Sequence, residues 1–418
     1  MTDFLWGVST SAFQIEGATS EGGRGPSVWD NFTNVHNGDT AEVACDHYHR
    51  WREDIALMTQ LGVNAYRFSI SWPRIQPTGK GPANTEGLDF YDRLVDALVD
   101  VGIAPVVTLY HWDTPQPLED EGGWLTRDIA DRFAEYTAIV ADRLADRVKL
   151  WMPINEPAMV TLLGYAIGQH APGKTMLFDA LPTAHHLNLA HGLSVQALRA
   201  AGAASVGTAN NHSPAWAATD ADQKAAAAYS DIHNWLYADP MLAGRYPDSL
   251  VDRMPIADGD LENIKQPLDF YGLNYYNPTR LKTPSEGNPL PFDLVDIDEY
   301  PKTGFGWPIV PDGLRQMITQ LRERHPDVPP VYITESGCSF PHVVEDTARI
   351  EYLDGHLRAA LDSGVRGYFV WSLIDNFEWD SGYSQRFGLV HVDYETQRRT
   401  PRDSFHWYRK VISGELSD

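Results

Sequence analysis

Two glutamates in this sequence directly follow short apolar runs, and carboxylates in such positions are candidates for chemistry. VYITESG, residues 331–337, leads from apolar residues into Glu335, while KLWMPINEP, residues 149–157, ends in Asn155, Glu156 and a proline. The apolar residues of a buried strand do not by themselves explain why a charged side chain should stand at the strand's end. Two carboxylates facing one substrate can, however, share acid/base and nucleophilic work.

Amide, imidazole, guanidinium and aromatic side chains follow the apolar runs elsewhere in the chain. This set does not suit a metal, but it suits a neutral ligand rich in hydroxyls, such as a sugar, which offers hydroxyls to hydrogen-bond and a C–H face to stack on. Two carboxylates beside a sugar indicate glycoside hydrolysis, with one as proton donor and the other as nucleophile or water-activating base. Besides Asn155, these residues are Gln14, Arg67, His111, Trp112, Asn274, Tyr276 and Trp371.

A proton donor in such a pair must stay protonated near neutral pH, which requires a raised pKa. A second, ionised carboxylate nearby supplies that shift by like-charge repulsion. Once the nucleophile carries a sugar, its charge disappears and the donor's pKa falls, so the same group can then act as the base that activates water. This switch is a physical reason to pair two glutamates.

Strand-like runs alternate with helical patterns along the chain, and this arrangement would position those residues. Alternation favours a parallel sheet, and eight apolar strands predict closure into a single (β/α)8 TIM barrel spanning residues 1–418. An open doubly wound sheet is the alternative, but it typically carries a glycine-rich nucleotide turn, and none follows the first strand. The predicted strands are 4–9, 64–70, 103–109, 148–154, 204–210, 270–275, 331–335 and 366–372.

The barrel interpretation explains why carboxylates end the strands. Residues at the carboxyl ends of barrel strands all face one mouth, where the chemistry of this fold takes place. An amphipathic pattern with Tyr48, Trp51 and Ile55 at helical spacing precedes the second strand, and residues 128–147 precede the fourth. Glu156 and Glu335 are therefore expected to leave the core where a substrate is held.

Composition and charge exclude several classes of function. The 418 residues carry a net charge of −24, so the chain has no general attraction to nucleic acid or to anionic membranes. Cys45 and Cys338 are the only cysteines, which predicts reduced thiols and a cytoplasmic location. The first residues, MTDFLWGVST, lack the pattern of a signal peptide, and no apolar run approaches the roughly 18 residues of a membrane span.

Three local patterns resemble other sites but are not interpreted as such. GQHAPGKT at 168–175 fits a phosphate-loop pattern, yet it lacks the strand before it and contains Pro172, so an ATP site at Lys174 is not expected. CDHYHRW at 45–51 and HHLNLAH at 185–191 collect histidines whose spacing does not place them on one helix face. The sequence predicts neither a metal nor a cofactor.

Motifs spread over nearly the whole chain resemble glycoside hydrolase family 1, the β-glucosidase family. They occur in the family's order, so the resemblance is highly specific. The motifs are FLWGVSTSAFQIEGA (4–18), YRFSISWPRI (66–75), LYHWDTPQPLEDEGGW (109–124), WMPINEP (151–157), DFYGLNYY (269–276), YITESG (332–337) and WSLIDNFEWDSGYSQRFGLVHVD (371–393).

The resemblance implies a role for each matched residue. Glu156 would be the acid/base and Glu335 the nucleophile of a retaining mechanism, in which the two carboxylates lie about 5 Å apart. Arg67 would hold the nucleophile's charge, and Trp371 would be a stacking platform. The resemblance also implies sugar binding by Gln14, His111, Asn155, Tyr276, Glu378 and Trp379.

Three positions refine this expectation. Ser336 stands where the family has Asn, next to the nucleophile but with no need to touch sugar. Glu156 is not the Gln of plant thioglucosidases, so proton donation is intact. Glu378 lies where the phospho-β-glucosidase branch would hold a phosphate, and its negative charge would repel one.

The expected activity is therefore exo-acting, retaining β-glucosidase action through a covalent glycosyl-enzyme. The substrate would be a small β-glucoside or a short oligosaccharide of the kind formed in cellulose degradation, with β-galactoside or β-fucoside hydrolysis as a side activity. A non-catalytic carbohydrate sensor on the same barrel is the alternative from another class, although binding alone gives no reason to pair two carboxylates. A nucleotide-dependent barrel enzyme is a third reading and would need ATP at Lys174. Oligomeric state and aglycone preference are not encoded in any readable motif.

Overall fold

Eight parallel strands form the centre of the molecule. The structure is a computed structural model that describes residues 4–415, so the outermost residues of the predicted 1–418 domain lie outside it. The strands pair in the order β4-β3-β2-β1-β11-β10-β7-β5. They are β1 (Leu5–Ser9), β2 (Ala65–Ser69), β3 (Ala104–Tyr110), β4 (Leu150–Ile154), β5 (Asn210–Asn211), β7 (Tyr271–Asn274), β10 (Val331–Ser336) and β11 (Gly367–Trp371).

Parallel bridges between β4 and the segment before β5 close this sheet into a barrel. Val206 pairs with Trp151 and Ala209 with Asn155, and Gly207 bridges to Phe270 on the other side. The predicted strand at 204–210 is less regular than expected. Its residues form single bridges to β4 on one side and to Phe270 on the other, and only the short β5 pairs continuously, with β7. The predicted (β/α)8 barrel is confirmed.

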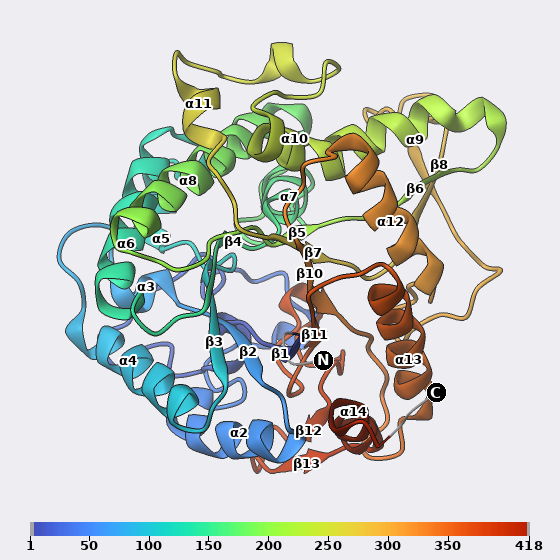
Figure 1. Cartoon of the computed structure of the whole chain (residues 1–418). Helices are drawn as coiled ribbons and strands as arrows, with labels where there is room; N and C mark the ends of the chain where they lie inside the picture. The colour runs from blue at the N-terminus through green and yellow to red at the C-terminus, as the bar shows by residue number, and fades with distance from the viewer. Residues whose placement is uncertain (1–3, 416–418) are drawn as a thin grey trace.

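Helices follow the strands and form an outer ring, which Figure 1 shows around the central strands. Sequence periodicity located two of them well. The pattern ending at Leu61 is an amphipathic helix, and the pattern predicted over residues 128–147 is an amphipathic helix over Asp128–Leu144. The ring comprises α2 (His47–Leu61), α4 (Thr85–Asp100), α6 (Asp128–Leu144), α8 (Leu181–Ala200), α10 (Leu236–Ala243), α12 (Pro311–Arg324), α13 (Thr347–Asp362) and α14 (Asp403–Ser413).

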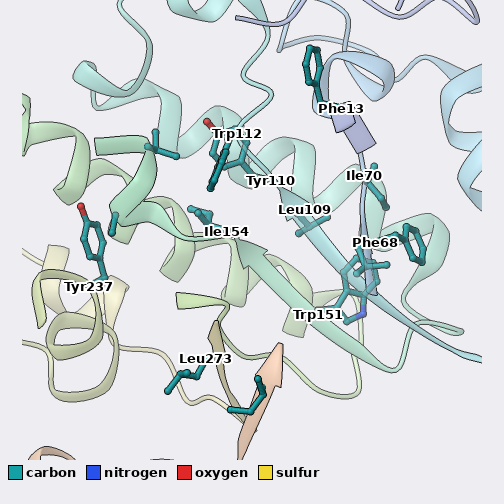
Figure 2. Packing of buried hydrophobic residues seen from close by; sticks show 14 of the residues in the cluster. Phe13, Phe68, Ile70, Leu109, Tyr110, Trp112, Trp151, Ile154, Tyr237 and Leu273 are labelled. Carbon is teal, nitrogen blue, oxygen red and sulfur yellow. The ribbon is translucent and has the colours of Figure 1, made fainter. Parts of the chain in front are cut away.

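The core has two parts because strand residues alternate between the two faces of the barrel wall. Leu150 and Met152 on β4 belong to a small cluster drawn from the barrel strands, whereas Trp151 between them belongs to the large cluster shared with the helices. Figure 2 shows this larger cluster, with Leu109 and Ile154 near the ends of β3 and β4. Both faces of the barrel wall are therefore packed beneath the strand ends.

Shorter elements connect these strands and helices. They are α1 (Ala12–Ile15), α3 (Trp72–Ile75), α5 (Gln116–Asp120), α7 (Pro157–Met159), α9 (Gln223–Ser230), α11 (Asp260–Ile264), the sheet of β6 (Ala215–Ala217), β8 (Thr279–Lys282) and β9 (Asp293–Val295), and the pair β12 (Val390–Val392) and β13 (Arg399–Pro401). Two π-helical segments, Val160–Ala166 and Asp231–Trp235, interrupt the regular helices. Within residues 4–415, no helix is long and apolar enough to cross a bilayer.

Candidate active site

A cavity of about 310 Å³ opens at the carboxyl ends of the barrel strands. Most of the residues that the sequence predicts for the site form its wall. Those in the wall are His111, Trp112, Glu156, Tyr276, Glu335, Trp371, Glu378 and Trp379. The strand-end argument therefore holds for both glutamates.

Glu335 on β10 accepts hydrogen bonds from a guanidinium and a phenol hydroxyl. Arg67 of β2 donates from Nη1 to Oε1 at 2.6 Å, and the hydroxyl of Tyr276 donates to Oε2 at 2.8 Å. Burial raises the pKa of the Glu335 carboxyl, and the Arg67 charge and both hydrogen bonds oppose that rise. A guanidinium in direct contact stabilises the charged form of a carboxyl even where water is excluded.

Glu156 at the end of β4 has a different environment. Its Oε1 accepts hydrogen bonds from the amide nitrogens of Asn274 at 2.7 Å and Asn211 at 3.2 Å, and no cation contacts it in the described chain. Burial, and next the charge of Glu335, raise the pKa of Glu156 to about 8. The two carboxyls thus differ in their contacts: Glu335 accepts from a guanidinium, whereas Glu156 accepts only from amides.

A chain of hydrogen bonds connects the two carboxyls. Arg67 donates to Glu335 and also, at 2.6 Å, to Oδ1 of Asn155, which accepts a second bond from Asn274 at 3.1 Å. Asn274 in turn donates to Glu156. Glu335 and Asn274 are register partners on neighbouring strands, so the barrel itself sets this arrangement. The separation of about 5 Å between the carboxylates stays a prediction.

The Asn155 amide also fixes the tautomer of His111. Because its oxygen already accepts two bonds, its nitrogen donates to Nε2 of His111 at 3.0 Å, and Nδ1 of that ring carries the hydrogen. Nδ1 is buried and has no partner within residues 4–415. Burial and the nearby Arg67 charge hold the pKa of His111 well below its ordinary value. His111 therefore keeps one neutral N–H donor that no group within residues 4–415 uses, and its ring lines the cavity.

Aromatic rings form one side of the cavity. The ring of His111 lies nearly parallel to that of Trp371, with centroids 5.7 Å apart, and to that of Trp379, at 5.9 Å, while Trp112 lies 4.6 Å from Trp379. The backbones of Trp112, Glu156 and Trp379 all have positive φ, at 75°, 43° and 51°. Non-glycine residues adopt this region at a cost, and such residues concentrate at functional sites.

Close packing of β10 against β11 aligns two parts of this wall. A Cβ at Gly337 would lie 1.7 Å from the carbonyl oxygen of Trp371, so only glycine lets the chain after Glu335 pass there. Ser336 turns away from the cavity, is fully buried, and lies 3.4 Å from the hydroxyl of Tyr352. The serine at this position therefore affects packing behind the strand rather than the cavity wall.

Glu378 forms the acidic end of the cavity. Burial, followed by the charges of Glu335, Asp380 and Glu156, raises the pKa of Glu378 to about 8. Gln14 donates to its Oε2 at 3.3 Å and to the carbonyl of Phe377 at 2.9 Å. Once ionised, the carboxyls grouped here disfavour an anionic ligand such as a sugar phosphate.

Four of the predicted residues lie behind the cavity wall. Each is almost completely buried and has its polar atoms engaged by neighbouring protein groups. Their contacts orient the wall residues. These four are Gln14, Arg67, Asn155 and Asn274.

Sequence reasoning missed several residues of the wall. Asn211 directly follows the predicted fifth strand, so the rule used for the other strand ends would have found it. Among the others, Asp380 and Phe387 lie within the matched motif 371–393 without having been singled out, Thr279 begins β8, and the rest lie in loops and helices. These others are Met159, Leu163, Gln169, His170, His212, Ser213, Tyr229, His233, Asn277, Thr279, Phe305, Trp307, Asp380 and Phe387.

The patterns that were set aside have structural roles. Lys174, the lysine of the phosphate-loop pattern, pairs with Glu119 at 2.6 Å and follows a π-helical segment instead of a strand. His47 bonds Asp54 through Nδ1 at 2.7 Å inside α2. Within residues 4–415, no group of three His, Cys, Asp or Glu residues is arranged to hold a metal ion.

Comparison with known proteins decides the family. The profile of glycosyl hydrolase family 1 matches residues 1–416. The chain belongs to glycosyl hydrolase family 1. It is therefore a glycoside hydrolase, a retaining exo-β-glycosidase, and the non-catalytic sensor and nucleotide-dependent alternatives fall away.

Individual members of family 1 are similar over their whole length. A bifunctional β-D-glucosidase/β-D-fucosidase of Bifidobacterium breve is 46% identical, with 98% of this chain and 97% of that protein aligned. The psychrophilic β-glucosidase BglU of Micrococcus antarcticus superposes with a TM-score of 0.95 at 42% identity, over 100% and 98% of the two chains. SghA, a virulence factor solved with the substrate analogue salicin, gives 0.94 at 43%, over 99% and 96%.

Proposed function

We propose that this family 1 enzyme is a β-glucosidase in which Glu335 is the nucleophile and Glu156 is the acid/base. One observation supports this assignment above the others. Arg67 and Tyr276 contact Glu335, which suits a permanent anion, whereas Glu156 has only amide contacts and a pKa raised to about 8. Only a protonated carboxyl can donate to the leaving oxygen at neutral pH.

In the first step, Glu335 attacks the anomeric carbon and Glu156 gives its proton to the glycosidic oxygen. The C–O bond to the aglycone breaks, and a glycosyl ester of Glu335 forms. Loss of the Glu335 charge then lowers the pKa of Glu156, because that charge is one cause of its rise. In the second step, Glu156 takes a proton from water, which attacks the anomeric carbon and releases Glu335.

The wall of the cavity supports binding of a single neutral sugar. The imidazole of His111 and the carboxyl of Glu378 are suited to sugar hydroxyls, and the indoles of Trp371 and Trp379 to its C–H face. Gln14 and Asn155 act behind them by fixing Glu378 and His111. Trp112 contributes through the aromatic stack and its bond from Nε1 to the carbonyl of Asn155 at 2.9 Å.

The substrate proposed is a small β-glucoside or a short β-linked gluco-oligosaccharide, such as those released in cellulose degradation. The salicin complex of a relative and the glucosidase/fucosidase activity named for another support a small glycoside with some tolerance in the sugar. We further propose that the chain acts as one catalytic domain in the cytoplasm, where Cys45 and Cys338, both buried and unpaired, would remain reduced.

The configuration of the first product tests the double displacement. Hydrolysis of an aryl β-glucoside followed by proton NMR should show β-glucose before mutarotation, because two inversions at the anomeric carbon restore the original configuration. Appearance of α-glucose first would mean direct attack by water and would exclude Glu335 as a nucleophile.

The pH dependence tests the acid assignment. Glu156 is protonated below its pKa of about 8 and loses its proton above it, so kcat/KM for a substrate with a poor leaving group should fall about tenfold per pH unit beyond that value. For a 2,4-dinitrophenyl glucoside, whose leaving group needs no proton, the pH profile of kcat/KM should lack this alkaline limb. Glu378 has a similar pKa, and the variant Glu378→Gln shows which of the two carboxyls causes the alkaline limb. If Glu156 causes it, the limb should persist in this variant and move to lower pH.

A further inference from the structure

The acid/base carboxyl has a second amide partner that the family motifs do not include. Oε1 of Glu156 accepts from Asn274, whose own oxygen is fixed by a 2.6 Å bond from the Thr334 hydroxyl. It also accepts from Asn211 on β5 at 3.2 Å. An asparagine amide can rotate by half a turn, which would point its oxygen instead of its N–H at Glu156, so something must hold Asn211 in its donor orientation.

His233 supplies that constraint. Its Nε2 lies 2.8 Å from Oδ1 of Asn211, and since an amide oxygen only accepts, Nε2 must carry the hydrogen. The His233 ring is 6% exposed, and burial lowers its pKa to about 4, so it remains a neutral donor across the working pH range. With this amide orientation, donation runs from His233 through Asn211 to Glu156.

The local fold holds His233 in place. It lies in the π-helical segment Asp231–Trp235 between α9 and α10, which packs against β5, and Figure 1 shows these two helices above the barrel strands. Tyr229, one turn earlier, stacks on the ring with centroids 5.1 Å apart and an interplanar angle of 11°. The Tyr229 hydroxyl is itself 3.0 Å from that of Thr279. π-Helical insertions frequently occur at functional sites.

We propose that His233 is a positioning residue for the reaction, acting through Asn211 to keep an N–H donor directed at Oε1 of Glu156. The inference rests on the proposed role of Glu156. The donor would fix the carboxyl's orientation for proton delivery in the first step and stabilise the carboxylate that forms when the proton leaves. With Asn274 as its only donor, the Glu156 carboxyl would be held less firmly in one orientation.

Kinetics of His233→Ala, Asn211→Ala and the double variant test this chain of contacts. For phenyl β-glucoside, kcat/KM should fall about tenfold in each single variant, and the alkaline limb should move to higher pH because the carboxylate has lost a donor. For the 2,4-dinitrophenyl glucoside, kcat/KM should stay within about twofold. The double variant should be no worse than Asn211→Ala alone, since His233 acts through it.

His233→Gln is the matched variant, because the glutamine Nε2 can donate at the same place as the histidine Nε2. It should restore most of the phenyl glucoside rate and return the alkaline limb toward that of the unaltered enzyme. Thermal unfolding of every variant shows whether the fold is kept. A failure of His233→Gln to recover with an intact fold would contradict a role through hydrogen bonding.

Two further outcomes would overturn the proposal. One is an equal loss on both aryl glucosides with an unmoved pH limb, which a purely structural residue would give. The other is additive loss in the double variant, which would place His233 outside the Asn211 contact. Glu156→Ala separates failure of the proposed function from failure of the positioning role. If the activity loss in Glu156→Ala does not depend on the leaving group, the proposed function itself fails. If that loss does depend on the leaving group but the His233 variants keep full activity, only the positioning role is rejected.

Discussion

Replacing Glu335 with glutamine should abolish turnover of every substrate, lowering kcat by about 10⁵-fold or more, the scale seen when an enzyme loses its nucleophile. The amide cannot form the glycosyl ester, and no other carboxylate of the wall is contacted by a guanidinium. The loss should be the same for good and poor leaving groups, because bond formation to the enzyme is needed in both cases. Steady-state rates on the dinitrophenyl and phenyl glucosides measure it.

The fold and the cavity must be shown to survive this change. Glutamine has nearly the volume of glutamate but leaves the Arg67 charge without its anion, which destabilises a buried site, so thermal unfolding and binding of a glucose analogue should accompany the kinetics. Glu119→Gln is the matched control, since Glu119 is a buried glutamate outside this cavity that pairs with Lys174. It should keep near-normal activity. A Glu335→Gln enzyme with more than a few per cent of activity would remove Glu335 from the nucleophile role.

Replacing Glu156 with alanine should produce a loss that depends on the leaving group. For cellobiose or phenyl glucoside, which need a proton on the departing oxygen, kcat/KM should fall about 10³-fold, within the range for general acid catalysis. For the 2,4-dinitrophenyl glucoside, kcat/KM should change little, while kcat falls because water then lacks its base in the second step. Comparing the two parameters across a series of aryl glucosides measures both effects.

Azide provides an independent check on the same variant. A small anion that needs no base can enter the space left by Glu156, attack the glycosyl ester and restore kcat for the dinitrophenyl substrate. The product should be β-glucosyl azide, because the ester of Glu335 is attacked from the opposite face. If Glu156→Ala loses activity equally on all leaving groups and azide has no effect, the roles of the two glutamates are wrongly assigned.

The pKa values link these predictions to the geometry. Glu156 and Glu378 both have pKa values raised to about 8, with burial as the main cause and the charge of Glu335 next. Removing that charge, whether by forming the ester or by Glu335→Gln, should lower both. The proposed acid/base switch would follow from the electrostatic coupling among these carboxyls.

Much of the barrel and of the site could be predicted from sequence because both rest on local periodicity. Apolar runs alternating with amphipathic patterns indicate strands and helices, and parallel closure brings the strand ends to one mouth. Glu156, Glu335, His111 and Tyr276 could be assigned to one site on that argument. The fifth strand was located but its regularity was overestimated, since it consists mainly of single bridges.

Only the tertiary structure decided which polar atoms meet. Nothing local to Asn155 shows that its oxygen is shared by Arg67 and Asn274, a contact that fixes the His111 tautomer. His233 lies beside an alanine-rich helical stretch, and its approach to Asn211 depends on the path of the chain between β5 and α10. Sequence patterns encode the type and buried face of each element, whereas contacts between loop residues depend on how separate elements are placed in space.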